Sequence, residues 1–416
     1  MRTVVVGNRK LARHLFRHLL NENWDVVGAL IPEGKLAATQ ANFVPFDELV
    51  KDTDYQLHET TDINDQQTHT WLKEINPDVC LCGGWSQIID ERILDVPDRG
   101  FLGFHSSRLP EGRGGAPVNW SIINGADEVY ISLFYYVEEV DAGNVLAQGS
   151  VPVTSRDDVS TVFDALAIEA CRLLLEVRPQ LEYANVNAEP QSFTDATYRP
   201  RRQPQDGLID WARDPSAQYD WIRAQTDPYP GAYTFHDNTK LTVWRAESVD
   251  RSVGDAPTGE VLDIVDGEGI DVRTGGGVIR LQRVKPDKRP SRWADQYVDN
   301  VDLSPGDKFG REYAPDDWLY TGIRGSTDPT SFDTNLPVGT AGELELVVFS
   351  GSCHSLQARV ILNDERIFED SVRVENTYRE TVEYAPVESG THSIRVEFDR
   401  ESERVNARFL KVFVHE

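Results

Sequence analysis

Apolar and polar blocks alternate through the first 180 residues in an order that predicts strands followed by helices. Thr3–Gly7 is a β-branched run that ends in glycine, and Leu11–Leu20 carries leucine and phenylalanine at helical spacing. Asp25–Ile31 predicts a second strand, Trp71–Ile75 part of another helix, and Pro77–Gly84 a buried strand. This order is typical of an α/β protein with a parallel, doubly wound sheet, whose ligands bind at the carboxyl ends of the strands.

The same pattern continues as far as residue 176. Tyr130–Val137 and Val145–Val153 predict two more strands, and Asp157–Glu176 predicts a long amphipathic helix. The turn Gly7–Ala12 lacks the three-glycine fingerprint of dinucleotide-binding sheets, so it gives no support for NAD. We place the first domain at residues 1–200.

A second domain follows a stretch that reads as a linker. Arg199–Asp206 is rich in proline and charge, as linkers are. Short strands separated by glycine-rich turns come next, such as Gly259–Val265 and Gly275–Gln282. They predict a small, OB-like β-barrel over residues 205–290.

The remaining chain is predicted to be a connector and a third domain. Residues 291–340 are rich in proline, aspartate and glycine, which is typical of a connector. From Glu343 onward, short strands alternate with turn signals. This spacing predicts a C-terminal β-sandwich over residues 341–416.

The charge balance is strongly acidic. Aspartate and glutamate number 69 against 42 lysines and arginines, which gives a formal net charge of −27, and only nine of the basic residues are lysine. Acid excess with arginine in place of lysine resembles the proteins of salt-loving archaea, and an ordinary acidic cytosolic protein is the alternative. Non-specific nucleic-acid binding needs clustered positive charge, so the composition disfavours nucleic acid as a partner.

No segment predicts a membrane or an export signal. Apolar runs such as Val79–Gly84 are far shorter than the ~20 residues of a spanning helix. The first residues lead straight into a strand and a turn, unlike a signal peptide. The four cysteines, Cys80, Cys82, Cys171 and Cys353, have no metal-ligand spacing. We therefore expect a cytoplasmic protein with reduced thiols and no metal.

Two polar side chains at strand ends are candidates for catalysis. His105 follows an apolar strand and precedes the glycine-rich loop Gly112–Pro117, and Asp141 lies in the turn Val140–Gly143. A carboxylate beside an imidazole can keep the ring charged, and the pair can then stabilise an oxyanion or relay a proton. Read alone, a structural histidine and an ordinary turn explain these residues as well.

The wider context favours the catalytic reading. His105–Gly125, with its Ser-Ser-Arg-Leu-Pro-Glu-Gly-Arg-Gly-Gly-Ala-Pro core, and Val140–Gln148 strongly resemble the folate-dependent formyltransferases. Tyr198–Trp211 and Pro228–Tyr233 resemble the junction and second domain of the members that act on methionyl-tRNA and on sugars. The resemblance spans about residues 1 to 285 and implies a Rossmann-like first domain.

The resemblance also implies a reaction and a catalytic set. In this family, an amine attacks the formyl carbon of 10-formyltetrahydrofolate, with an Asn, a His two residues later and an Asp downstream. His105 would stabilise the oxyanion, Asp141 would tune its ring and pass protons, and Ser132 matches a hydroxyl position on the strand lining the site. Gly103 stands where the family has Asn.

The glycine at position 103 leaves two alternatives open. A preorganised donor to an oxyanion is typically worth ~2.7–4 kcal/mol, so its loss without replacement slows the reaction. Either a backbone amide, a water or another side chain such as Ser86 or Asn119 takes its place, or the protein is a weakened or hydrolytic relative that binds folate.

Two segments match the family's folate-binding walls, and one turn and one loop are expected to contact substrate. A flat pterin ring suits apolar walls with exposed main-chain groups. The residues of the two walls are Trp85, Ser86, Gln87, Ile88, Ile89, Val137, Glu138, Glu139 and Val140. The expected substrate contacts are Asn8, Arg9 and Lys10, at a helix N-terminus suited to phosphate, and Arg113 and Gly114 in the glycine-rich loop. Core packing explains Trp85 equally well. Arg9 and Lys10 are explained equally well as solvated surface charges.

The acceptor of the formyl group is the least determined feature. Acidity argues against tRNA, although salt adaptation weakens that argument, and Arg199, Arg201 and Arg202 form the obvious basic cluster. The C-terminal segment, notably Gly390–Asp399, weakly resembles carbohydrate-binding modules, although a calcium-binding Asn-Asp pair is not evident. A nucleotide-linked amino sugar is therefore the expected acceptor, with a glycan as a partner of the third domain. Some family members form homodimers, but no pattern in this sequence marks an interface.

Overall fold

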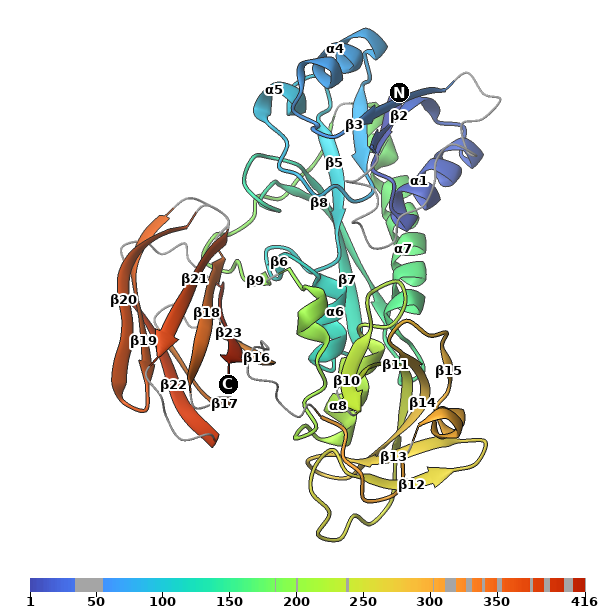
Figure 1. Ribbon diagram of the computed structural model, residues 1–416. Coiled ribbons are helices and arrows are strands. Elements are labelled where there is room, and N and C mark those ends of the chain that lie inside the picture. Colours follow the sequence, from blue (N-terminus) through green and yellow to red (C-terminus); the bar gives the residue numbers. More distant parts are fainter. Residues whose placement is uncertain are drawn as a thin grey trace. The chain divides into compact units, whose positions relative to one another are not determined.

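The chain folds into two compact units, which are described one at a time. The computed structural model describes residues 1–33, 55–183, 185–199, 201–236, 239–301, 303–310, and the strands from 319 to 415 whose bounds are given below. The first unit contains Met1–Val118, Asp127–Thr154 and Thr161–Tyr198, and the second contains Asn119–Ala126, Ser155–Ser160 and Arg199–Glu416. Figure 1 shows the first unit mainly in blue to green.

A seven-stranded sheet forms the centre of the first unit, in the order β3-β2-β1-β4-β5-β7-β8. Its strands are β1 (Arg2–Val6), β2 (Asp25–Pro32), β3 (Gln56–Thr60), β4 (Val79–Cys82), β5 (Phe101–His105), β7 (Glu128–Tyr135) and β8 (Val145–Pro152). The first five strands are parallel, as the sequence predicted. The expectation of a wholly parallel sheet is wrong, however, because β7 runs antiparallel to both β5 and β8. The segment 136–144 between β7 and β8 is too short for the crossover that a parallel pair needs.

Helices cover both faces of this sheet (Figure 1). They are α1 (Lys10–Asn21), α4 (Gln66–Ile75), α5 (Glu91–Leu94) and α7 (Val159–Glu182), while α6 (Pro117–Ile123) leads into the second unit. Val4 and Val6 of β1 share one face because strand side chains alternate, and they pack with Leu72 of α4 in one core cluster. On the other face, α1 and α7 lie side by side, since Arg178 Nη1 donates to Glu22 O at 2.9 Å.

The cysteines of β4 are part of the same core. Cys80 and Cys82 are buried and free, and they share a face, as their spacing predicted. Burial raises the pKa of both thiols, so they remain protonated. Cys171 is also a free thiol, and Cys353 lies outside the described residues.

The second unit begins with a six-stranded antiparallel sheet in the order β10-β11-β14-β13-β12, with β15 on β14. Its elements are η1 (Pro204–Gly207), α8 (Pro215–Arg223), β10 (Ala232–His236), β11 (Thr239–Val249), β12 (Val261–Val265), β13 (Gly269–Arg273), β14 (Val278–Pro286), β15 (Arg292–Trp293) and η2 (Asp295–Asn300). The strand path does not close on itself among the described residues, so the OB-like barrel stays a prediction. Tyr297, Leu303 and Phe309 are buried in the same core, so this packed region extends beyond the expected boundary at 290.

The C-terminal strands form two four-stranded sheets, β16-β23-β18-β21 and β17-β22-β19-β20. They are β16 (Leu319–Ser326), β17 (Ser331–Val338), β18 (Ala341–Phe349), β19 (His354–Leu362), β20 (Glu365–Val374), β21 (Thr377–Tyr384), β22 (Gly390–Asp399) and β23 (Ala407–His415). β16 and β17 fall inside the segment 291–340 that we expected to be a connector, and they pair with β23 and β22. Strand pairing, which glycine and proline content obscured, therefore begins before residue 341.

In the described parts of the chain, no helix combines the length and apolar character that crossing a bilayer requires.

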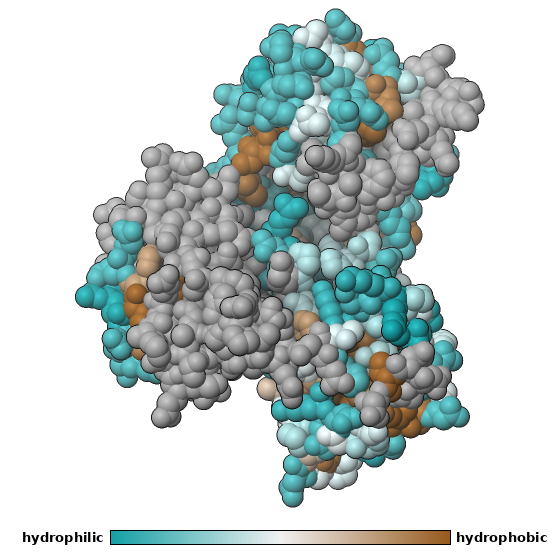
Figure 2. Space-filling view, viewed as in Figure 1, coloured by the Kyte–Doolittle hydropathy of each residue, from teal (hydrophilic) through white to brown (hydrophobic). Residues whose placement is uncertain are grey.

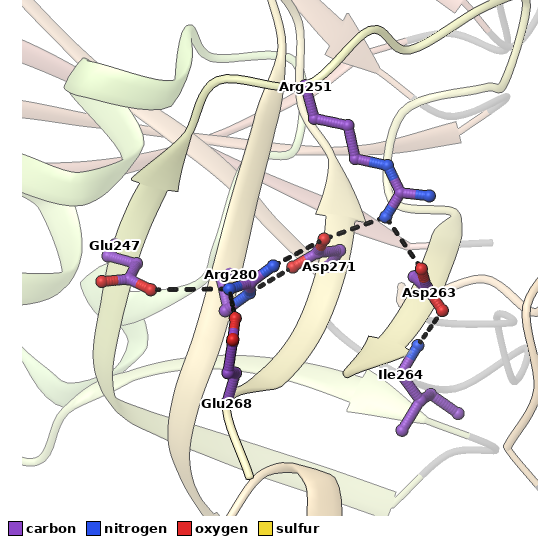
Figure 3. A network of polar contacts seen from close by, with 7 residues as sticks. All are labelled: Glu247, Arg251, Asp263, Ile264, Glu268, Asp271 and Arg280. Atoms are coloured by element: carbon purple, nitrogen blue, oxygen red, sulfur yellow. Dashed lines mark hydrogen bonds and ion pairs between the residues drawn. The ribbon is translucent and has the colours of Figure 1, made fainter. Parts of the chain in front are cut away.

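An ion-pair network joins neighbouring strands of the six-stranded sheet (Figure 3). Asp271 of β13 is 1% exposed, and its carboxylate accepts from Arg280 Nε at 2.6 Å and from Arg251 Nη1 at 2.9 Å. Arg280 of β14 also contacts Glu268 and Glu247, and its hydrogen bond to Asp271, followed by the charges of Asp271, Glu268 and Glu247, raises the pKa of its guanidinium. The network fixes the register of β13 against β14 with charge as well as with backbone hydrogen bonds.

We expect Asp271→Asn to lower the free energy of unfolding by about 1–3 kcal/mol, because two arginines lose a buried anionic partner. Asp263→Asn is the matched control: Asp263 contacts the same Arg251 at 3.2 Å, but its side chain is 48% exposed, so the loss should stay below about 1 kcal/mol. Urea unfolding of the full chain in concentrated salt measures both. Equal losses of unfolding free energy in the two variants would show that the burial of Asp271 adds nothing to stability.

Candidate functional site

The structure brings His105 and Asp141 together. His105 is the last residue of β5, its side chain is buried, and its Nδ1 lies 3.4 Å from Asp141 Oδ2. On the other side of the ring, Nε2 lies 2.8 Å from the carbonyl oxygen of Gly112. Both neighbours are acceptors, and only an imidazole with protons on both nitrogens can donate to both. The surroundings therefore suit a charged ring at the carboxyl end of β5.

Backbone contacts hold Asp141 in place. Its φ of 52° lies in the left-handed region, which aspartate adopts more readily than most residues. Its Oδ2 accepts the Gly114 N–H at 2.8 Å, and Gln191 Nε2 donates to the carbonyl oxygens of Asp141 and Gly143 at 2.9 and 2.6 Å. A Cβ at Gly143 would lie 1.8 Å from Tyr135 O, so only glycine fits this turn.

Arg113 supports the site from within and does not face a ligand. Its side chain is 0% exposed, and its Nε and Nη2 donate to Gln191 Oε1 at 3.1 and 2.8 Å. Nη1 donates to Tyr198 Oη at 3.0 Å. The expected substrate contact by the Arg113 side chain is therefore wrong, and the Gly114 N–H is likewise engaged by Asp141. The reason is burial: the guanidinium ties the glycine-rich loop to the segment that follows α7.

Ser132 also acts as a support. Its buried hydroxyl donates to Ser107 O at 2.7 Å and accepts from Leu109 N at 3.2 Å and from Gln148 Nε2 at 2.8 Å. These three partners use the hydroxyl fully. The catalytic assignment of Ser132 is therefore replaced by a role in shaping the loop between His105 and Arg113.

Gly103 leaves room that an aromatic ring fills. A Cβ added at Gly103 would lie 2.1 Å from Cε1 and 2.7 Å from Cζ of Tyr136. Asn119 does not replace the missing asparagine, because it is buried in the second unit and its Nδ2 donates to Ala224 O at 2.6 Å. Ser86 lies at an exposed position.

The two expected folate walls present apolar side chains to solvent. Ile88 is 43% exposed and Val137 is 44% exposed, and Figure 2 shows apolar patches interrupting the mainly hydrophilic surface of the first unit. Glu138 Oε1 accepts the Glu91 N–H at 3.3 Å and so ties the two segments together. Exposed apolar groups of this kind fit a flat heteroaromatic ring such as a pterin.

Other residues of the walls have structural roles. Gln87 Nε2 donates to Thr61 O at 3.0 Å, and its Oε1 accepts from Ile63 N at 3.2 Å. Ile89 is buried in the core, and the ring of Trp85 packs against the same cluster. Gln87 and Ile89 therefore shape the wall from behind. Glu139 and Val140 are half-buried and lead into the Asp141 turn.

The expected phosphate-binding turn contains one notable side chain. Asn8 is 1% exposed, and neither its Nδ2 nor its Oδ1 has a hydrogen-bond partner among the described residues. Lys10 Nζ, by contrast, lies 2.5 Å from Asp164 Oδ1, and the Arg9 side chain packs against Gly84. Lys10 is thus held by α7, and a phosphate contact in this turn stays a prediction.

Sequence reasoning missed Gln191, Tyr198 and Tyr136. The first two follow α7 in a segment without strong periodicity, and Tyr136 sits one residue beyond β7, in what we predicted to be strand. One sequence signal pointed toward Gln191 and Tyr198: Arg113 lies in a glycine-rich loop, and a buried arginine needs hydrogen-bond acceptors. In the part of the chain that the structure describes, no cluster of three or more His, Cys, Asp or Glu side chains could hold a metal ion.

Comparisons with known proteins identify similar chains. The family model described as formyl transferase matches residues 1–177, and the model of the formyl transferase C-terminal domain matches residues 201–299. Methionyl-tRNA formyltransferase of Caldanaerobacter subterraneus is 30% identical over 309 residues, 74% of this chain and 99% of that protein. The Bacillus subtilis protein of the same name is 28% identical over 314 residues, 74% of this chain and 98% of that protein.

Solved structures show the same fold at lower identity. HypX from Aquifex aeolicus in complex with tetrahydrofolic acid has a TM-score of 0.53 and 17% identity, over 77% of this chain and 52% of that chain. WlaRD, described as a sugar 3N-formyl transferase, has a TM-score of 0.51 and 15% identity, over 70% of this chain and 99% of that chain.

We expect Gln191→Ala to lower the free energy of unfolding by about 1–3 kcal/mol, because a buried guanidinium and the Asp141 turn lose their shared partner. Asn187→Ala, at an exposed position in the same segment, is the control and should change it by less than about 0.5 kcal/mol. Thermal unfolding in concentrated salt measures both variants. If Gln191→Ala is as stable as the control variant, Gln191 does not hold the site.

Proposed function

The chain belongs to the formyl transferase family, whose formyl donor is formyltetrahydrofolate, and we propose that its acceptor is the amine of a nucleotide-linked amino sugar. In the reaction, the amine nitrogen bonds to the formyl carbon and the bond from that carbon to the folate nitrogen breaks. The amine gives up one proton, and the folate nitrogen takes one. The site must therefore stabilise negative charge on the formyl oxygen and move a proton.

His105 and Asp141 supply both functions in this proposal. In the structure, His105 Nε2 lies 2.8 Å from Gly112 O, so in this proposal the Nε2–H of a charged His105 exchanges that carbonyl for the developing oxyanion when the formyl group binds. The Asp141 carboxylate keeps the ring charged and oriented. Asp141 uses Oδ2 for both of its contacts, to His105 and to Gly114. Its Oδ1 is the atom left to accept the proton of the attacking amine.

The preference for a sugar over tRNA rests on how the basic residues are used. Arg202 Nη2 donates to Asp206 O at 2.6 Å and to Gln225 Oε1 at 2.7 Å, and its guanidinium lies 4.6 Å from the Trp221 ring centroid. One member of the obvious basic cluster is thus engaged inside the second unit. A polyanion such as tRNA would meet a chain with a net charge of −27, which repels its phosphates.

Methionyl-tRNA is the second candidate acceptor. The relatives with 28–30% identity carry that name, and they match about three quarters of this chain. The family models end at residue 299, so β16 to β23 lie beyond them. We propose that these C-terminal strands form a β-sandwich and that its ligand is a glycan. We also propose that the acidic composition reflects a salt-rich archaeal cytoplasm. A homodimer remains an expectation of the family resemblance.

The acceptor is tested by incubating the full chain with 10-formyltetrahydrofolate and a panel of dTDP-, UDP- and GDP-linked amino sugars, with methionyl-tRNA in parallel. Molar salt should be present, because a carboxylate-dense protein repels itself in dilute buffer. We expect formylation of one sugar class, at a rate at least tenfold above that with methionyl-tRNA. Product with methionyl-tRNA alone would overturn the sugar assignment, and tight folate binding without product would favour a non-transferring relative.

A further inference from the structure

Tyr136 fills the space on β5 where a side chain at position 103 would lie. Because an added Cβ at Gly103 would approach Cε1, Cζ and Cδ1 of Tyr136 to 2.1, 2.7 and 2.9 Å, the two positions exclude each other's side chains. Glycine at 103 is therefore matched to tyrosine at 136. The nearest atoms include Cζ, which carries the hydroxyl, so the phenol end of the ring lies beside the strand.

This placement puts the phenol on the catalytic face of β5. Gly103 and His105 are two residues apart on one strand, so a side chain at 103 would project to the same face as His105. The Tyr136 N–H donates to Phe101 O at 2.9 Å, which anchors the residue to β5. Its ring packs against Phe134 with centroids 5.2 Å apart and planes tilted by 46°. The backbone of Tyr136 is thus anchored to β5, and its ring packs against Phe134.

The hydroxyl of Tyr136 is available as a donor. It makes no hydrogen bond to the described residues, and the side chain is only half-buried. Burial and, after it, the nearby Cys82 and Asp141 raise the pKa of Tyr136 well above its ordinary value. The phenol therefore keeps its proton.

We propose that the Tyr136 hydroxyl is a catalytic hydrogen-bond donor to the formyl oxygen, beside His105. When the amine nitrogen bonds to the formyl carbon, an electron pair moves onto that oxygen, and the Tyr136 O–H donates to it. When the bond to the folate nitrogen breaks, the pair returns to form the carbonyl. Tyr136 keeps its proton throughout, so the step needs no additional acid or base. Gly103 is then no defect: it makes room for this donor.

Tyr136→Phe tests the proposal because it keeps the ring and removes only the hydroxyl. With the acceptor found by the panel, we expect kcat to fall about 100-fold or more while KM for the folate donor changes less than about threefold. Tyr135→Phe is the matched control, since side chains alternate along β7 and position 135 faces the other side of the sheet. A kcat for Tyr136→Phe within twofold of the control variant overturns the proposal.

A spectroscopic measurement needs no acceptor and keeps the test independent of the sugar assignment. In isotope-edited infrared spectra of 10-formyltetrahydrofolate labelled at the formyl carbon and bound to the full chain, a lost donor strengthens the carbonyl bond. We expect the formyl stretch to shift to higher wavenumber in Tyr136→Phe and to stay unchanged in Tyr135→Phe. An unchanged stretch in both variants overturns the proposal.

Gly103→Asn supplies the reverse test. The new side chain must displace the Tyr136 ring, so we expect activity at or below that of the unsubstituted protein. A tenfold gain would show that the site lacked a donor, and it would overturn the role of Tyr136.

Discussion

The contact between the His105 ring and the Asp141 carboxylate depends on a turn that neither residue could maintain alone. Asp141 has a positive φ, and its carboxylate is aimed at the ring only while the Gly114 N–H and the Gln191 amide hold the turn. Gln191 is fixed in turn by the buried guanidinium of Arg113, which donates to it twice. A chain of hydrogen bonds thus runs from the buried Arg113 through Gln191 to Asp141 and His105, as a preorganised site requires.

Burial explains why several polar residues near the site do not meet a ligand. Arg113 and Ser132 lie in motifs that resemble those of formyltransferases. In the structure, however, both side chains form their hydrogen bonds with neighbouring segments of the protein. They fix where His105 and Asp141 lie. In the proposed reaction, fewer groups are left for substrate: the His105 imidazole, one Asp141 carboxylate oxygen, the phenol of Tyr136 and the exposed apolar side chains of the expected folate walls.

Much of the fold follows from the sequence, because periodicity reports which face of an element is buried. The parallel strands β1, β2 and β4, the free cysteines of β4 and the pairing of His105 with Asp141 were all predicted from local pattern and motif. The antiparallel β7 and the strands β16 and β17 were not, because strand direction and pairing depend on contacts distant in the sequence. The sequence did not predict that the Tyr136 ring occupies the space beside Gly103, for the same reason: the ring comes from the end of a neighbouring strand.

The central claim is that His105, held by Asp141, carries formyl transfer. Single-turnover transfer of the formyl group by His105→Ala tests it most directly, with His69→Ala on α4 as a control outside the site. The account predicts a fall of at least about 100-fold for His105→Ala with an unchanged unfolding temperature, and none for His69→Ala. A folded His105→Ala protein that transfers the formyl group at the rate of the control would contradict it.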